Sequence, residues 1–170
     1  MSRYRKIDVR IWNDAKFLSL SRDAQFIFLF LLTHPGMTAL GAMRSSVPGL
    51  AAEIKQDLEP FRERFAELIR HGMVEFDETV SYVGLPNFLK YNGPDNPNAV
   101  KSWSSALDLI PECRLKLALL TRAKTCAESR GKGFSAVLPE PFLEPLAEPF
   151  HEPFDHGSPN QEQEQEQEQK

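Results

Sequence analysis

The chain has 170 residues, which fits one domain with appendages. Residues 1–133 contain nineteen Lys or Arg against fifteen Asp or Glu, a net charge of +4, whereas residues 134–170 contain one against nine, a net charge of −8. A basic body with an acidic tail is typical of nucleic-acid-binding proteins. The longest apolar run, residues 26–32, is too short to cross a bilayer and no signal-peptide pattern is present, so we expect a cytoplasmic protein that does not bind membranes.

The first 20 residues open with a basic cluster and then turn apolar. Arg3, Arg5 and Lys6 form this cluster, and Trp12 follows it. One interpretation is a flexible basic arm that contacts DNA phosphates or the minor groove, with Trp12 packing the base of the arm onto the domain. The other is a solvated chain end, because small Lys/Arg clusters are common near termini.

Residues 22–34 predict a helix that begins after Ser21 and ends at Pro35-Gly36. Its apolar residues leave no polar face, so we expect a central helix that is covered on nearly every side. Residues 38–47 predict a short strand that pairs with the hairpin described next.

Residues 47–87 predict a helix, a tight turn, a second helix and a hairpin. Pro48 suits the first turn of the first helix, Asp57 can cap the second, and Gly72 suits its left-handed end. The second helix should bury one apolar stripe, made by Phe61, Phe65, Leu68 and Ile69. The period then changes to two around a turn at 77–79, which predicts a hairpin.

This order is the plan of a winged helix-turn-helix, a DNA-reading module. A generic small α+β domain is the alternative, since any helical hairpin gives two amphipathic runs. On the second helix, Arg62, Arg64 and Arg70 are the candidate DNA contacts. The face opposite its apolar stripe should present these residues: Gln56, Glu59, Glu63, Glu67 and Arg70. The wing tip is Asp77-Glu78, so we expect it to stay off the phosphates.

Residues 87–96 predict a turn-rich connection in which Lys90 and Tyr91 could contact a DNA backbone or an unpaired base, or could pack under their own domain. A helix is expected from Pro97 to 110 and another over 112–129. The second is basic, which could extend a DNA surface or only keep the helices soluble, and its leucines could form a homodimer seam. Cys113 and Cys126 would lie about 20 Å apart along it, too far for a disulfide.

From residue 134 the composition changes to a Glu-Pro-apolar repeat and then to alternating Gln and Glu. Proline at this density favours extended polyproline conformation, and the end of the chain should be disordered. The repeat is either a stiff spacer or a row of short anchors for a partner protein. The candidate partner-binding residues are Phe142, Leu146, Phe150 and Phe154.

Several runs also carry a resemblance: YRKIDVRIWND, FLFLLTHPGMTALGAM, VPGLAAEI, LPNFLKYNGPDNPNAVKSW and the SPNQEQEQEQEQ ending. They resemble a family of bacteriophage and prophage proteins with an amino-terminal winged helix, of the replication or replisome-organiser type. The match covers most of residues 1–110. It implies a role in phage DNA replication inside the bacterial host cell and supplies no catalytic residues.

The motifs of common enzymes are missing from the sequence: no phosphate-binding loop, nucleophile elbow, HExxH or zinc-spaced Cys/His pairing occurs. We therefore expect no enzyme, no cofactor and no metal site. The predicted organisation is mainly α with a small β hairpin (α+β): a basic arm (1–20), a winged helix-turn-helix domain (21–97), a helical extension (98–133) and a Pro/Glu-rich, disordered acidic tail (134–170).

The predicted function is that of a phage protein in DNA replication initiation. It would bind double-stranded DNA through the winged helix and recruit a helicase or helicase loader through its tail. A phage transcriptional regulator is one alternative, and it would need a dimer and a palindromic operator. A winged-helix adaptor that binds only proteins is the other.

Overall fold

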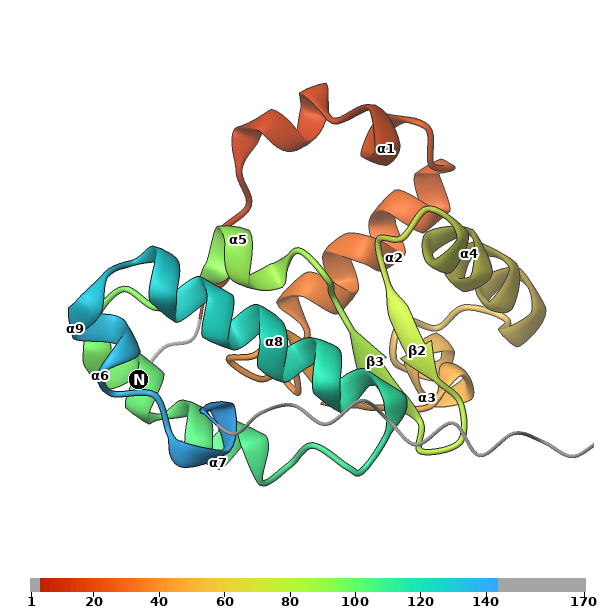
Figure 1. The fold of residues 1–170 in the computed structure, drawn as a ribbon. Coiled ribbons are helices and arrows are strands. Elements are labelled where there is room, and N and C mark those ends of the chain that lie inside the picture. Colours follow the sequence, from red (N-terminus) through yellow and green to blue (C-terminus); the bar gives the residue numbers. More distant parts are fainter. Residues whose placement is uncertain (1–3, 144–170) are drawn as a thin grey trace, which may run out of the picture.

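The computed structural model describes residues 4–143, in which short helices surround a small three-stranded antiparallel sheet (Figure 1). The described part is mainly helical, as an α+β sequence pattern predicts. The described part starts with an extended segment and two short helical turns, η1 (Val9–Asn13) and α1 (Ala15–Leu18). Asp8 and Asp14 cap these turns, because their side chains accept hydrogen bonds from the backbone N–H groups of Arg10 and Phe17.

The first long helix, α2 (Arg22–Thr33), begins where the Ser21 hydroxyl accepts a hydrogen bond from the backbone N–H of Ala24. Ile27 and Leu31 are fully buried, as expected for a central helix. The expectation that nearly every side is covered is wrong, because Phe26 is 53% exposed and residues 28–30 are half-buried. α2 packs against α4.

The helix pair predicted from residues 47–70 is present as α3 (Val47–Glu53) and α4 (Leu58–Arg70). Ser46 caps α3, and the left-handed Lys55, with φ of 57°, turns the chain between the helices. Gly72, with φ of 65°, follows the end of α4 in the left-handed conformation that glycine adopts without strain. Of the predicted apolar stripe of α4, Ile69 is the exception, because it is 40% exposed.

The sheet has the strand order β1-β3-β2, with strands β1 (Ala42–Arg44), β2 (Glu75–Asp77) and β3 (Tyr82–Gly84). Val83 of the central strand pairs with Met43 on one side and with Phe76 on the other. Strand β1 is shorter than the predicted strand over residues 38–47, because residues 38–41 form a tight turn. The Thr38 hydroxyl donates a hydrogen bond to the Ala42 carbonyl and stabilises this turn.

The remaining helices are α5 (Phe88–Asn92), α6 (Pro97–Lys101), α7 (Trp103–Leu107), α8 (Arg114–Ser129), α9 (Lys132–Ser135) and the single turn η2 (Glu140–Phe142). The connection after the hairpin therefore contains a helical turn, α5. The helix predicted from residue 97 is split into α6 and α7 at Ser102, and the next helix begins at residue 114 rather than 112.

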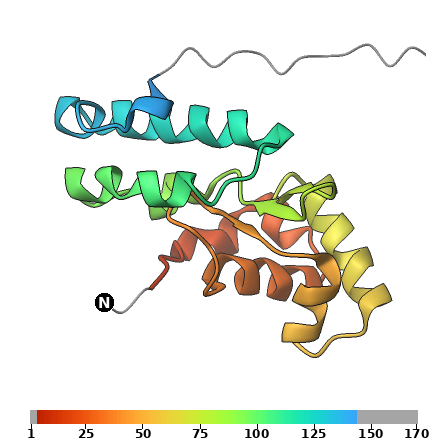
Figure 2. The same cartoon turned by 90° about the horizontal axis from the view of Figure 1, so that it is seen from below.

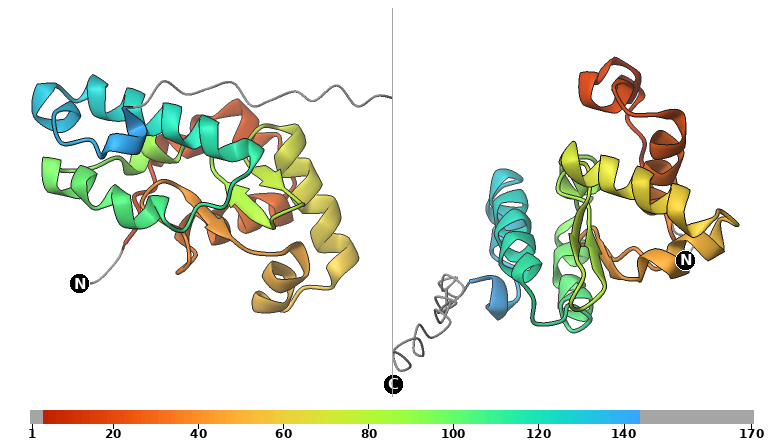
Figure 3. Two further views of the ribbon diagram at one scale, coloured as in Figure 1. Left: turned by 60° about the horizontal axis from the view of Figure 1, so that its bottom comes forward. Right: turned by 90° about the vertical axis from the view of Figure 1, so that its right-hand side faces the viewer.

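Two groups of helices lie on either side of the sheet. The right-hand view of Figure 3 shows the sheet nearly edge-on, with α8 on one side and α2, α3 and α4 on the other. Figure 2 shows α8 and the α6–α7 pair running side by side in a layer next to the sheet. The buried core is continuous from Phe17 to Phe142, so the α8 layer is packed onto the sheet and does not hang free.

Candidate nucleic-acid interface

The exposed face of α4 mixes arginines with glutamates. Arg62 lies 3.8 Å from Glu59, Arg64 lies 3.9 Å from Glu63, and Arg70 is exposed at the end of the helix. The structure therefore places the three predicted arginines on one helix, with Arg62 and Arg70 the more accessible.

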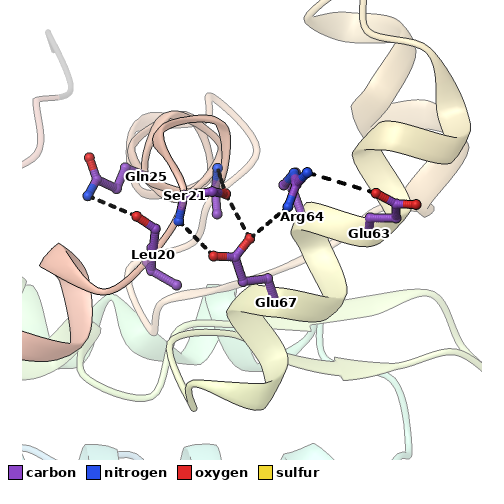
Figure 4. A network of polar contacts seen from close by, with 7 residues as sticks. Leu20, Ser21, Gln25, Glu63, Arg64 and Glu67 are labelled. Carbon is purple, nitrogen blue, oxygen red and sulfur yellow. Dashed lines mark hydrogen bonds and ion pairs between the residues drawn. The ribbon is translucent and has the colours of Figure 1, made fainter.

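Glu67 does not belong to this exposed face, and its expected position there is wrong. The side chain is buried, and its carboxylate accepts hydrogen bonds of 2.7 Å from both the backbone N–H and the hydroxyl of Ser21 (Figure 4). Arg64 adds a third contact at 3.4 Å. The Ser21 backbone N–H is the main reason that the pKa of Glu67 is held below its usual range. Glu67 therefore joins α4 to the start of α2.

The hairpin turn is also less exposed than a free wing. Asp77 is 5% exposed and accepts hydrogen bonds from the backbone N–H and hydroxyl of Thr79, so only Glu78 of the predicted Asp-Glu tip faces outward. The Asp77 pKa is lowered, with the Thr79 hydroxyl as the main cause. The position of Asp77 corrects the expectation that both residues form the tip.

Helix α8 covers the outer strand β2. Arg122 donates to both carboxylate oxygens of Glu75 at 2.7 Å, and Arg114 donates to the Phe76 carbonyl at 2.7 Å. These contacts hold α8 along a strand that would otherwise present an unpaired edge. The leucines proposed as a dimer seam are used in this layer, because Leu115, Leu119 and Leu120 are buried within one chain.

The basic arm is held against the body rather than free. Arg5 donates to the Met37 carbonyl at 2.5 Å and lies 5.1 Å from the centre of the Phe88 ring. Lys6 forms a 2.7 Å ion pair with Asp95, and its backbone N–H bonds the Asn92 side chain. The interpretation as a flexible arm is therefore wrong for Arg5 and Lys6, and Arg3 lies outside the described residues. Trp12 is 59% exposed and touches the domain edge-on, with its ring 5.6 Å from that of Phe17.

Lys90 lies on α5, with its ammonium 5.3 Å from the centre of the Tyr91 ring. Lys90 is exposed and Tyr91 is 39% exposed. Figure 1 places α5 and α4 toward opposite ends of α2, so Lys90 and the α4 arginines do not form one cluster.

Of the four predicted partner-binding residues of the tail, only Phe142 lies in the part of the chain that the structure describes. Phe142 is fully buried, and its ring lies 5.9 Å from that of Trp103, so its assignment as an exposed partner anchor is wrong. Leu138 is 7% exposed and belongs to the same core. The other three anchors, Leu146, Phe150 and Phe154, lie outside the described residues.

A pocket of about 380 Å³ lies where residues 6–17 pass over α2 and α5, and sequence reasoning did not find it. Figure 1 shows this N-terminal segment arching above the two helices. The pocket floor is apolar, with Phe17, Phe28 and Phe88 among its residues, and lysines and asparagines line its rim. Its lining comes from four segments that are far apart in the chain. Only the alternation of basic and apolar residues at 6–18 gave a local signal.

Within residues 4–143, no group of His, Cys, Asp and Glu side chains is arranged to hold a metal ion, and both cysteines are free thiols. No helix in this range is both long and apolar enough to cross a membrane. Comparisons of the chain with family models, with curated proteins and with solved structures each find no match.

Proposed function

We propose that residues 21–97 form a winged helix-turn-helix through which the protein binds double-stranded DNA during phage DNA replication initiation. The observation that carries this proposal is the element order α2-β1-α3-α4-β2-β3 combined with the strand order β1-β3-β2. A helix, a strand, a helix-turn-helix pair and a closing hairpin are the parts of this DNA-reading module. The role in replication comes from the resemblance of the sequence to phage replication proteins.

In this proposal α4 is the recognition helix. Arg62 and Arg70 are its accessible cations, and Lys55 is exposed in the turn that precedes it. The ion pair of Arg62 with Glu59 is long and exposed, and such pairs contribute only about 0–1 kcal/mol. Phosphates can therefore replace the glutamate at little cost. Arg64 is less available, because it also supports the buried carboxylate of Glu67.

The wing contributes little to DNA contact in this proposal. Arg114 and Arg122 of α8 bond β2, Asp77 is buried and Glu78 would repel phosphates. Arg5 and Lys6 are already bonded to the body. Binding therefore depends on α4 and the turn before it.

The test compares two variants that each remove two positive charges. Arg62→Ala/Arg70→Ala changes α4, and Lys101→Ala/Lys132→Ala changes exposed lysines of α6 and α9. Gel-shift titrations of duplex DNA over a salt series measure affinity and its salt dependence. Two lost phosphate contacts should reduce the slope of log K against log salt by about 1.8 for the α4 variant alone. Equal slopes for the two variants would contradict the proposal.

A protein-binding adaptor is the second candidate, and the mixed charge of α4 together with the covered wing favours it. An adaptor would bind duplex DNA no better than an unrelated protein of the same net charge, and the α4 variant would leave duplex binding unchanged. A transcriptional regulator would instead bind a palindromic site as a dimer.

Recruitment of helicase or loader, in the host cytoplasm, is proposed for the segment that contains Leu146, Phe150 and Phe154. A pull-down with purified helicase and loader tests that step.

A further inference from the structure

The pocket beneath residues 6–17 has a shape and a floor that suit a small organic ring. Its volume of about 380 Å³ lies at the lower end of the range for pockets that bind small organic molecules, about 300–1,000 Å³. The half-buried Phe28, Ile11 and Met73 supply accessible apolar surface in its lining, and the almost fully buried Phe17, Phe88 and Leu85 belong to the core against which they pack. A floor of this kind gains free energy when a flat apolar or aromatic group displaces water from it.

The charges on the rim are positive once the existing partners are counted. Lys6 pairs with Asp95, Arg10 pairs with Asp8, and the Asp14 carboxylate caps α1 but keeps its negative charge, so with Lys16 and Lys90 the remaining rim charge is about +1. Lys16 and Lys90 are then the lining cations without a carboxylate partner in the described part of the chain. Both are exposed, and Lys90 lies above the ring of Tyr91. A ligand that carries an anionic group beside its ring would satisfy them.

Side-chain amides add a third type of contact to the rim. Asn92 is engaged with the backbone of Lys6, whereas Asn87 stands at the start of α5 without a capping hydrogen bond from its side chain. Asn13, on η1, also lines the pocket and is exposed. An amide offers a donor and an acceptor together, which matches the edge of a nucleobase.

From this combination we propose that the pocket binds one nucleotide. The base lies on the aromatic floor, Asn13 and Asn87 bond its edge, and Lys16 and Lys90 hold its phosphate. Tyr91, at 39% exposure on the same rim, is placed to stack a neighbouring base when the nucleotide is part of a single strand. An acidic peptide would also satisfy the lysines and could bond the amides through its backbone N–H and C=O groups, so it is the competing ligand in the tests below. The site differs from the duplex-binding face of α4 and does not depend on it.

The first measurement is the binding of a fluorescein-labelled oligothymidylate, followed by anisotropy over a salt series. Lys16→Ala/Lys90→Ala should weaken binding about tenfold and reduce the salt slope by about 1.4, since each phosphate contact of a single strand contributes about 0.7. The matched control, Lys101→Ala/Lys132→Ala, removes the same charge from α6 and α9 and should leave both quantities nearly unchanged. Circular dichroism and thermal melting show whether each variant is folded.

The second measurement uses a reporter already in the chain. Trp12 is exposed with its ring 5.6 Å from that of the pocket residue Phe17, whereas the other tryptophan, Trp103, is 1% exposed. A bound base should quench Trp12 emission, and Trp12→Phe should remove most of this signal. Asn13→Ala/Asn87→Ala, which changes no charge, should weaken oligonucleotide binding while keeping the salt slope.

Competition with thymidine monophosphate distinguishes a free nucleotide from a nucleotide within single-stranded DNA as the ligand. Displacement of the strand at matched concentration indicates a free nucleotide, and binding of the strand alone indicates single-stranded DNA; both support the site. Equal losses in the lysine variant and its control would overturn it. So would lysine-dependent binding of an acidic peptide of residues 144–158 in place of the oligonucleotide. Duplex binding by the α4 variant is measured separately, so either proposal can fail alone.

Discussion

Glu67 joins the end of α4 to the start of α2 through one carboxylate. Its two bonds from Ser21 lower its pKa, so the folded-state pKa lies below the unfolded-state value. A group of this kind stabilises the fold fully above its unfolded pKa of about 4.3, and this contribution is lost as the pH falls through the folded pKa. The contact therefore supports the fold at neutral pH and weakens in acid.

We predict that Glu67→Gln lowers the free energy of unfolding at neutral pH by about 1–2 kcal/mol, because an amide bonds Ser21 more weakly than a carboxylate does. The difference from wild type should shrink as the pH falls below the unfolded-state pKa of about 4.3 and through the lower folded-state pKa of Glu67. Urea denaturation at neutral pH and over an acid series measures it. The control is Glu63→Gln on the exposed face, whose 3.9 Å pair with Arg64 should contribute less than about 0.5 kcal/mol. A pH-independent loss in Glu67→Gln would show that the charge is unimportant.

At the level of elements, α8 stabilises the edge strand β2 by an ion pair that is partly shielded from water. Arg122 and Glu75 have side-chain exposures of 27% and 30%, and the guanidinium reaches both carboxylate oxygens. We predict a coupling energy of about 1 kcal/mol for this pair in a double-mutant cycle with alanine. The Lys116–Glu112 pair, which joins the first turn of α8 to the segment before it and has Glu112 87% exposed, should give less than about 0.5 kcal/mol. Equal coupling for the two pairs would mean that α8 is not held to β2 by charge.

Local patterns predicted the elements whose cause is local. The cap at Ser21, the left-handed Gly72 and the apolar spacing of α4 are encoded within a few residues, and α2 and α4 were predicted within about one residue of their bounds. The predicted cap Asp57 stands at the start of α4, but its side chain makes no capping hydrogen bond. The misassigned residues depend on distant partners. The local pattern places Glu67 on the surface, because the contact with Ser21 that buries it comes from a distant part of the chain. The pocket likewise forms only where four segments that are far apart in the sequence come together.

For the whole molecule, the buried core reaches into the Pro-rich region. Leu138 and Phe142 pack at its end, with Phe142 against Trp103. We predict that truncation after Gly133 lowers the free energy of unfolding by at least the cost of Phe142→Ala, about 3–5 kcal/mol. Truncation after Leu143 keeps this packing and should leave the melting temperature nearly unchanged. If the protein truncated after Gly133 melts at the wild-type temperature, the packing of Phe142 contributes nothing to stability.

The charge of the chain is divided at the same place. Residues 1–143 carry nineteen Lys or Arg against sixteen Asp or Glu, a net charge of +3, and residues 144–170 carry one against eight, a net charge of −7. We predict that truncation after Leu143 strengthens non-specific duplex binding at low salt, because the acidic segment competes with phosphates for the same cations. The gain should fade toward physiological ionic strength, where exposed charges are screened beyond about 8 Å.

A full-length variant separates charge from chain length. It has the same number of residues and changes four glutamates to glutamine: Glu162, Glu164, Glu166 and Glu168. The segment beyond Leu143 then keeps a net charge of −3, and this variant should show about half of the truncation's gain in low-salt affinity if competition is roughly proportional to charge. Gel shifts over a salt series measure both proteins beside wild type. Truncation that strengthens binding while the glutamine variant matches wild type would show that the segment blocks DNA by its bulk, since the two changes differ in length but share the loss of charge.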